Sequence, residues 1–330
     1  MKVLVTGATG AVGPRVVAAL NDAGISVRTF SIHHSPPGAF PEGVEELIGD
    51  ITDPVAVQSA VNGVDGIIHL AALLHIVDPS TELQGKFERI NVGGTINVVE
   101  AALKAGVKRI VFFSTIAVYG TSDGAVLDEL SPTHPDTFYA QTKCAAERIV
   151  LDAKNADMQP IGTVLRFGAV YGSRIKGNYE RLTHSLARNR FIPVGNGLNR
   201  RTLIYDKDVG RSAVAAVSHP NAAGKIFNVT DGVFHSLKDI IASICSALGR
   251  RSPQFSLPLG PVRGIINLIE KGSNTLGLKP PVTRVMLDKY TEDIAVDGTL
   301  IQRELGFIPE YNLKSGWEET ILNMRRSGAL

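Results

Sequence analysis

The chain has 330 residues, of which 44% are hydrophobic and 20% charged, and its formal net charge is +2. This composition indicates a soluble globular protein of one large domain or two, and the small net charge gives no reason to expect a nucleic acid or a membrane as partner. No apolar run reaches the roughly 18 residues that a transmembrane helix needs, and the two cysteines indicate no disulfide framework. The first predicted strand begins at the N-terminus with no signal peptide before it, so we expect a cytoplasmic location. The eight histidines show no metal-ligand spacing, and we expect no metal site.

The first fifty residues follow the order strand, glycine loop, helix, strand. The apolar run 2–6 predicts a strand that is buried on both faces of a parallel sheet. Three glycines spaced three apart, from Gly7 to Gly13, lead into a helix over 14–20, and a second strand covers 27–30. Glycines in this pattern allow a sharp turn, the approach of a pyrophosphate and close packing of helix on sheet. The unit therefore predicts dinucleotide binding at the start of the helix.

Strands and helices continue to alternate through the first half of the chain. The patterns predict strands over 44–48, 66–72, 109–114 and 161–167, helices over 54–61, 82–105 and from 136 onward, and loops over 32–43 and 120–135.

The second half is less regular. Its patterns predict helices over 178–190, 207–218, 236–248 and 314–326, short strands over 192–194, 202–204 and 226–229, and a surface segment rich in proline and glycine over 251–263. This order predicts an α/β fold, with a Rossmann-type doubly wound parallel sheet and a smaller C-terminal α/β substrate lobe. We expect the NAD(P)-binding domain to span 1–167 and the mainly substrate-binding lobe to span 168–330, with the chain crossing back to the sheet near 202–230.

Tyr139 and Lys143 carry the clearest chemical signal. Residues four apart share one face of a helix, so the hydroxyl and the ammonium lie on the same side. A free phenol has a pKa of ~10, and a nearby cation favours its ionised form. Tyr139 can then exchange a proton with a carbinol or ketone oxygen while a nicotinamide carries the hydride. Two adjacent hydroxyls, Ser114 and Thr115, end the preceding apolar strand and are candidates to bind the same oxygen.

These motifs together resemble the extended short-chain dehydrogenases/reductases, in the NAD-dependent epimerase/dehydratase family that acts on nucleotide sugars. The matching stretches are Thr6–Gly13, Gly49–Ile51, His69–Ala72, Asn91–Asn97 and Leu165–Gly172. The resemblance implies a catalytic triad of Thr115, Tyr139 and Lys143. It also implies the following cofactor-binding residues: Gly7, Thr9, Gly10, Ala11, Val12, Gly13, Ser31, Asp50, Ile51, Leu70, Ala71, Ala72, Asn91, Tyr139, Lys143 and Phe167.

Within the family, three stretches are similar to nucleotide-sugar 4-ketoreductases of surface-polysaccharide synthesis. They are Val77-Asp-Pro, the segment 175–182 and the segment 199–209. The resemblance implies that the substrate meets Ser114, Thr115, Asn178 and Arg201, with the guanidinium on the diphosphate. The leading expectation is reduction of a 4-keto group on a UDP- or other nucleotide sugar. A UDP-sugar 4-epimerase is the alternative, followed by a steroid- or flavonol-type reductase and by a non-catalytic dinucleotide sensor.

Two positions depart from the family pattern. Ser31 ends the second strand where NAD-preferring members carry an acidic residue for the ribose hydroxyls. The lack of that charge leaves NAD and NADP open with a slight lean to NADP, for which Arg15 or His33 would have to bind the 2′-phosphate. Ala169 replaces an asparagine of some 4-epimerases. By resemblance we also expect a homodimer, built through the predicted helices over 82–105 and 136–154.

Overall fold

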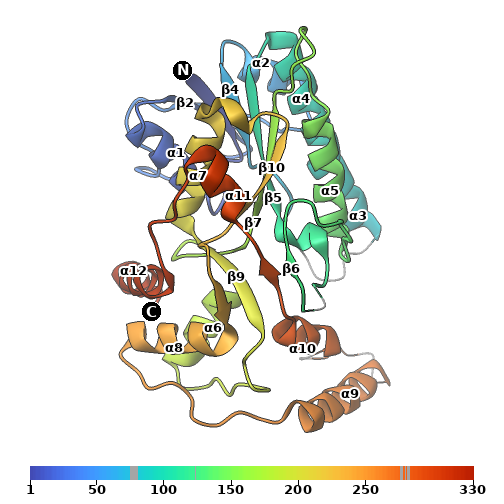
Figure 1. Cartoon of the computed structure of the whole chain (residues 1–330), viewed down its shortest axis with the longest axis vertical. Coiled ribbons are helices and arrows are strands. Elements are labelled where there is room, and N and C mark those ends of the chain that lie inside the picture. Colours follow the sequence, from blue (N-terminus) through green and yellow to red (C-terminus); the bar gives the residue numbers. More distant parts are fainter. Residues whose placement is uncertain (75–80, 123, 276–277, 279, 281–282) are drawn as a thin grey trace.

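The computed structural model describes residues 1–74, 81–122, 124–275, 278, 280 and 283–330. Within them, seven parallel strands form one sheet in the order β10-β7-β5-β4-β1-β2-β3 (Figure 1). The strands are β1 (Lys2–Thr6), β2 (Ser26–Ser31), β3 (Glu45–Ile48), β4 (Gly66–His69), β5 (Arg109–Thr115), β7 (Gly162–Phe167) and β10 (Lys225–Val229). The strand order reverses between β1 and β4, and ligands of doubly wound sheets bind beside such a reversal. The predicted Rossmann-type fold is confirmed.

Helices cover both faces of this sheet. On one face lie α1 (Gly13–Asp22), α7 (Asp206–Ser218) and α11 (Thr299–Leu305), and on the other lie α2 (Pro54–Val61), α4 (Gly94–Ala105) and α5 (Phe138–Leu151). Strand β1 shows how the sequence builds two cores at once. Val3 and Val5 join the core under α1 and α7, whereas Leu4 joins the core under α2 and α4, because successive side chains of a strand point to opposite faces. The unbroken apolar run of β1 follows from this double burial.

The single helix predicted over 82–105 is divided in the structure. It consists of α3 (Thr81–Phe87), one π-helical stretch η1 (Glu88–Gly93) and α4, and it ends at Gly106 in the left-handed conformation, with φ of 70°. A π-helical turn takes up an extra residue within an α-helix and is frequent at functional sites. Here it carries Asn91, which turns out to contact the helix of Tyr139 and Lys143.

A second lobe lies below the carboxyl ends of the strands (Figure 1). It contains a three-stranded sheet of β8 (Ala169–Tyr171), β9 (Arg200–Tyr205) and β11 (Phe234–Ser236), with helices α6 (Asn178–Ala187), α8 (Leu237–Leu248) and α12 (Leu313–Arg326). Its core includes Ile240 and Ile244 of α8 together with Trp317, which stacks on Tyr171. Two short strands, β6 (Val126–Leu127) and β12 (Ala295–Val296), pair beside it, and the short helices η2 (Ile116–Tyr119) and η3 (Pro220–Ala222) complete the connections.

The structure corrects the sequence prediction at several elements of the second half. No strand covers 192–194, where Val194 makes only an isolated bridge to Leu257, and α6 ends three residues earlier than predicted. The segment predicted as irregular over 251–263 is irregular as far as 258, but its last five residues, 259–263, belong to α9 (Leu259–Thr275), and α10 (Arg284–Thr291) follows. Pro261 falls in the first turn of α9, where a helix needs no amide donor, so proline there starts a helix rather than a loop. Helix α11 was not predicted either.

Candidate active site

The glycine loop between β1 and α1 has the sharp turn and the close backbone contacts that its sequence predicts. Gly7 has a φ of +69°, and a Cβ there would lie 2.7 Å from the backbone of Ala71. A Cβ at Gly13 would lie 2.1 Å from the carbonyl oxygen of Ala8, so the close contact of helix and loop requires glycine. Helix α1 begins without a side-chain cap or an acidic residue in its first turn, which leaves its free N–H groups to an anion. The predicted loop residues Thr9, Gly10, Ala11 and Val12 all lie in this turn.

The other predicted cofactor residues lie at the same edge of the sheet. Ser31 ends β2, and its buried Oγ accepts from the Thr9 N–H at 3.4 Å. Asp50 and Ile51 follow β3, and the stretch Leu70–Ala72 follows β4. Phe167 ends β7, where its ring lies 4.5 Å from that of Phe113. Because parallel strands share one carboxyl edge, residues 160 positions apart in the sequence lie along the edge at which doubly wound sheets have their ligand crevice.

One argument for NADP loses its support. Arg15, one of the two side chains available for a 2′-phosphate, forms an ion pair with the fully buried Asp206 of α7, with 3.2 Å between Nε and Oδ2. A guanidinium held in this way stabilises a buried carboxylate that would otherwise be isolated. His33, the second side chain, is exposed.

Helix α5 presents Tyr139, Lys143 and Glu147 at four-residue intervals on one face. The Lys143 side chain is 3% exposed, and its Nζ lies 4.0 Å from the centre of the Phe112 ring. Burial lowers the pKa of Lys143 to about 7, and the charge of Glu147 opposes that shift. Burial raises the pKa of Tyr139 to about 12, so at neutral pH this residue is a phenol with a proton to donate.

Glu147 was missed in the sequence. It takes a bidentate contact from Arg166 of β7, with Nη2–Oε2 at 2.6 Å and Nε–Oε1 at 3.0 Å, and both side chains are buried. The pair holds the carboxylate of Glu147 one helical turn beyond Lys143 on α5. The spacing could have indicated Glu147, because it lies four residues after Lys143 and therefore shares its helix face.

The two adjacent hydroxyls at the end of β5 differ in their surroundings. Ser114 is buried, and its Oγ donates to Glu147. Thr115 is half-buried, and its Oγ1 accepts from the Ala117 N–H at 3.1 Å, which leaves the hydroxyl proton to donate elsewhere. Successive residues of a strand point to opposite sides. The structure thus gives Thr115, rather than Ser114, the hydroxyl that is open to another partner.

Asn91 ties the loop after β4 to the catalytic helix. Its Oδ1 accepts from the Leu73 N–H at 2.7 Å, and its Nδ2 donates to the Leu73 carbonyl at 3.2 Å and to Thr142 Oγ1 at 3.1 Å. Thr142 in turn donates to the Tyr139 carbonyl at 2.9 Å. The π-helical turn of η1 therefore places the side-chain amide of Asn91 in contact with both the loop after β4 and helix α5.

A buried histidine extends this network, and sequence reasoning gave it no role. Thr6 donates to His69 Nδ1 at 2.6 Å, and His69 Nε2 donates to Thr95 Oγ1 at 3.1 Å, since the Thr95 hydroxyl itself donates to the Asn91 carbonyl. This chain of donors assigns the neutral tautomer with its proton on Nε2. Burial, with a contribution from the charge of Lys143, lowers the pKa of His69 to about 3. His69 is thus a neutral brace between β1, β4 and α4.

Asn178 and Arg201, the two residues expected to bind the sugar diphosphate, lie in different surroundings. Asn178 is exposed at the first position of α6. Arg201 of β9 donates through Nη2 to the carbonyls of Lys289 and Tyr290, at 2.6 and 2.9 Å, and so holds the end of α10. The stretch Val77-Asp-Pro lies outside the described residues.

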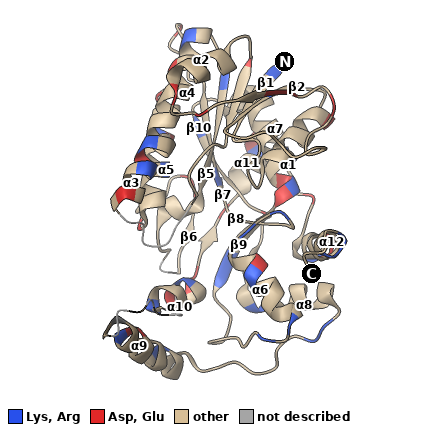
Figure 2. Ribbon diagram, turned by 180° about the vertical axis from the view of Figure 1, so that it is seen from behind, with Lys and Arg blue, Asp and Glu red and all other residues tan. Residues whose placement is uncertain are grey.

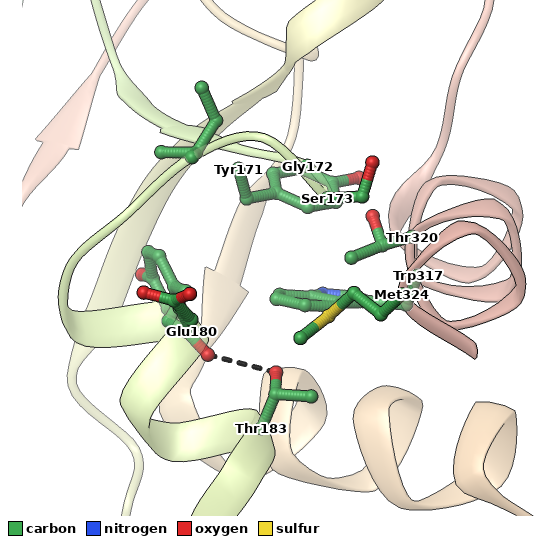
Figure 3. A pocket seen from close by; sticks show the side chains of 10 residues that line it. Tyr171, Gly172, Ser173, Glu180, Thr183, Trp317, Thr320 and Met324 are labelled. Carbon is green, nitrogen blue, oxygen red and sulfur yellow. Dashed lines mark hydrogen bonds between the residues drawn. The ribbon is translucent and has the colours of Figure 1, made fainter. Parts of the chain in front are cut away.

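A small cavity in the second lobe is distinct from this crevice. It measures about 10 Å³ and lies between the turn after β8, α6 and α12 (Figure 3). Trp317 lines it, and among the described residues the Trp317 Nε1 has no hydrogen-bond partner. That volume admits about one water molecule, which such an indole N–H would bind, and it is far too small for a nucleotide or a sugar.

Comparison with known proteins identifies the family. Residues 3–230 match the model of the NAD dependent epimerase/dehydratase family. The chain belongs to this family. A curated relative, the N-acetyl-alpha-D-glucosaminyl-diphospho-ditrans,octacis-undecaprenol 4-epimerase of Escherichia coli O157:H7, is 30% identical over 97% of this chain and 94% of its own. The UDP-glucose 4-epimerase of Vibrio cholerae is 26% identical over 96% of this chain and 94% of its own.

Two further likenesses bear on the substrate and the cofactor. A 3 beta-hydroxysteroid dehydrogenase/Delta 5-->4-isomerase of Mycobacterium tuberculosis is 28% identical over 97% of this chain and 89% of its own. The solved structure of MoeE5 in complex with UDP-glucose and NAD has a TM-score of 0.76 and 26% identity, and the match covers 99% of both chains. The family is NAD-dependent, and the slight lean to NADP is not supported.

The buried lysine leads to a test by pH. Burial lowers the pKa of Lys143 to about 7, against 10.5 in the unfolded chain. Lys143 therefore destabilises the folded, ligand-free protein most below pH 7, where it is charged in both the folded and the unfolded chain. The penalty declines between pH 7 and 10.5, because there only the unfolded chain keeps the proton. We expect Lys143→Met to raise the free energy of unfolding at pH 6 by roughly 5 kcal/mol, since each pKa unit is worth about 1.4 kcal/mol. Urea unfolding at pH 6 and pH 9.5 measures this, and a gain that grows with pH would contradict it.

Proposed function

We propose that this protein is an NAD-dependent 4-epimerase of a sugar that is carried on a diphosphate. The observation that supports this most strongly is the face of α5, on which Tyr139 and Lys143 lie one turn apart, with Lys143 packed over Phe112 of β5, the strand that ends at the half-buried Thr115. The two 4-epimerases among the relatives, each matched over almost its full length, favour the same reaction. Tyr139, Lys143 and Thr115 are the catalytic residues of the proposal.

Each residue has a role that its surroundings allow. Bound NAD would supply the acceptor, and afterwards the donor, of the hydride at C4 of the sugar. To take up the proton of the C4 hydroxyl Tyr139 must first be ionised, so the phenol of the free protein loses its proton before the oxidation, and the proton that the phenolate then gains returns to the C4 oxygen in the reduction. Lys143 lies one helical turn away and, when charged, stabilises that phenolate. Thr115 donates its hydroxyl proton to the C4 oxygen and holds it toward Tyr139.

Reduction of a 4-keto sugar is the second candidate, and Ser31 is the observation that favours it. An epimerase returns the hydride to its own intermediate and gains from a tightly held cofactor, whereas a reductase exchanges its cofactor at every turnover. Without an acidic residue at the end of β2, the adenosine ribose loses one expected pair of hydrogen bonds. That loss weakens retention of the cofactor and favours exchange.

The experiment gives the purified protein three substrates without added cofactor. UDP-N-acetylglucosamine and a polyprenyl diphospho-N-acetylglucosamine carry the sugar on the two kinds of diphosphate, and a 3β-hydroxysteroid represents the remaining relative. Inversion at C4 of either sugar, detected by NMR, is the expected result. Parallel runs with added cofactor test the rivals: reduction of a 4-keto nucleotide sugar by added NADH, with no inversion at C4 of either sugar, would replace the epimerase by the reductase, and oxidation of the steroid alone by added NAD would contradict both.

A further inference from the structure

Helices α9 and α10 form an arm at the end of the molecule that is farthest from the seven-stranded sheet (Figures 1 and 2). Helix α9 packs on α10, and the two are joined by the ion pair of Arg263 and Asp288, with 2.5 Å between Nη2 and Oδ1. The end of α10 is held in turn by Arg201 of β9. The arm is therefore attached to the second lobe, while α9 itself has little of the protein around it.

One face of α9 is apolar and exposed. Ile265, Leu268 and Ile269 are spaced three and four apart, so they lie side by side on the helix, and they are 57%, 72% and 37% exposed. On α10, Val285 and Met286 are also exposed. Phe255, which precedes the arm, is 85% exposed. The three side chains of α9 form the contiguous part of this exposed apolar surface, and contiguous exposed apolar patches mark surfaces that bind a partner or a membrane.

The same region is basic. Helices α9 and α10 carry the cations Arg263, Lys271, Arg284 and Lys289 against the anions Glu270 and Asp288, a formal surplus of two positive charges. Lys271 and Arg284 are exposed, and within the described ranges neither forms an ion pair. Figure 2 marks the positions of Lys and Arg in blue along the ribbons of α9 and α10.

We propose that the α9–α10 arm docks on an anionic phospholipid membrane, with the apolar face of α9 in the interface. A helix with Leu and Ile on one face and Lys and Arg on the other lies in the plane of a bilayer surface, and acidic headgroups attract the cations. Charge complementarity decides between occupants, because a second copy of the arm would bring two basic surfaces together. Among the described residues no helix is long and apolar enough to cross a membrane, so the attachment is peripheral. The inference does not depend on the proposed reaction.

Vesicle sedimentation tests the proposal with the full chain. We expect the protein to bind vesicles containing phosphatidylglycerol at least tenfold more tightly than vesicles of phosphatidylcholine alone, and to lose this preference in high salt. The double variant Ile265→Ser/Leu268→Ser should bind the acidic vesicles at least tenfold more weakly. The matched control is Leu130→Ser, at a leucine that is 93% exposed outside the arm, and it should bind like the wild type.

A second variant separates charge from apolar contact. Lys271→Glu/Arg284→Glu changes two exposed side chains and should abolish the preference for acidic vesicles while leaving the melting temperature unchanged. Three results would overturn the proposal: no sedimentation of the wild type with acidic vesicles in low salt, equal binding by wild type and the Ile265→Ser/Leu268→Ser variant, or an oligomer of the wild type that this variant dissociates. The last result would assign the apolar face to a second copy of the chain.

Discussion

Replacing Tyr139 by phenylalanine is expected to lower turnover by about 10²–10⁴-fold, because the C4 oxygen loses the group that takes and returns its proton. The ring of Tyr139 packs edge-on to Phe87, with centroids 6.4 Å apart, and phenylalanine keeps that contact. We therefore expect the fold and the affinity for NAD to change little. Steady-state turnover, together with NAD titration by calorimetry, measures the two quantities separately.

The matched control is Tyr311→Phe. The Tyr311 hydroxyl accepts from Lys207 at 3.1 Å, and both lie outside the crevice, so the variant removes a phenolic oxygen without touching the proposed chemistry. Its turnover should stay within about twofold of the wild type. If Tyr139→Phe retained wild-type turnover, the proton transfer would belong to another group and the assignment of α5 as the catalytic helix would fail.

Replacing Gly13 by alanine is expected to abolish NAD binding. The new Cβ would lie 2.1 Å from the carbonyl oxygen of Ala8, a distance that forces either the start of α1 or the glycine loop to move. Overpacking of this kind costs about 1–3 kcal/mol of stability, and the shifted amides no longer meet the phosphates. Thermal melting with and without NAD reports both effects, since bound NAD should raise the melting temperature of the wild type only.

Gly85→Ala provides the control for that variant. Gly85 lies within α3, where an added Cβ meets no atom within 4 Å, and alanine there favours the helix by about 1 kcal/mol. We expect Gly85→Ala to melt at or above the wild-type temperature and to bind NAD normally. Normal NAD binding by Gly13→Ala would show that the close approach of loop and helix is not what forms the cofactor site.

Local patterns predicted the first half of the fold well. The apolar run of β1, the glycine spacing and the stop at Gly106 each depend on neighbours in sequence, and the structure bears them out. The same holds for the shared helix face of Tyr139 and Lys143. The π-helical turn at Asn91 was not predicted, because the hydrogen bonds of Asn91 to Leu73 and Thr142 join segments that are distant in the sequence. Tertiary contacts of this kind leave no periodic signal.

The second half shows the limit of composition as a guide. Proline and glycine near 260 suggested a loop, but at the first turn of α9 they start a helix. The distinction between Ser114 and Thr115 required the buried pair of Glu147 and Arg166, which comes from a helix and a distant strand. Arg201 shows the same limit, since its contacts with α10 become visible only in three dimensions. The assignment of Asn178 and Arg201 to the substrate stays a prediction.

The most direct measurement follows the hydrogen at C4 of the sugar. Hydride transfer within one site keeps that hydrogen, whereas abstraction of a proton from carbon exchanges it with solvent. If the reaction is run in D₂O with a diphosphate-linked N-acetylglucosamine that the protein accepts, NMR of the inverted product should show no deuterium at C4. Deuterium at C4 of the product would contradict a hydride mechanism beside Tyr139 and Lys143.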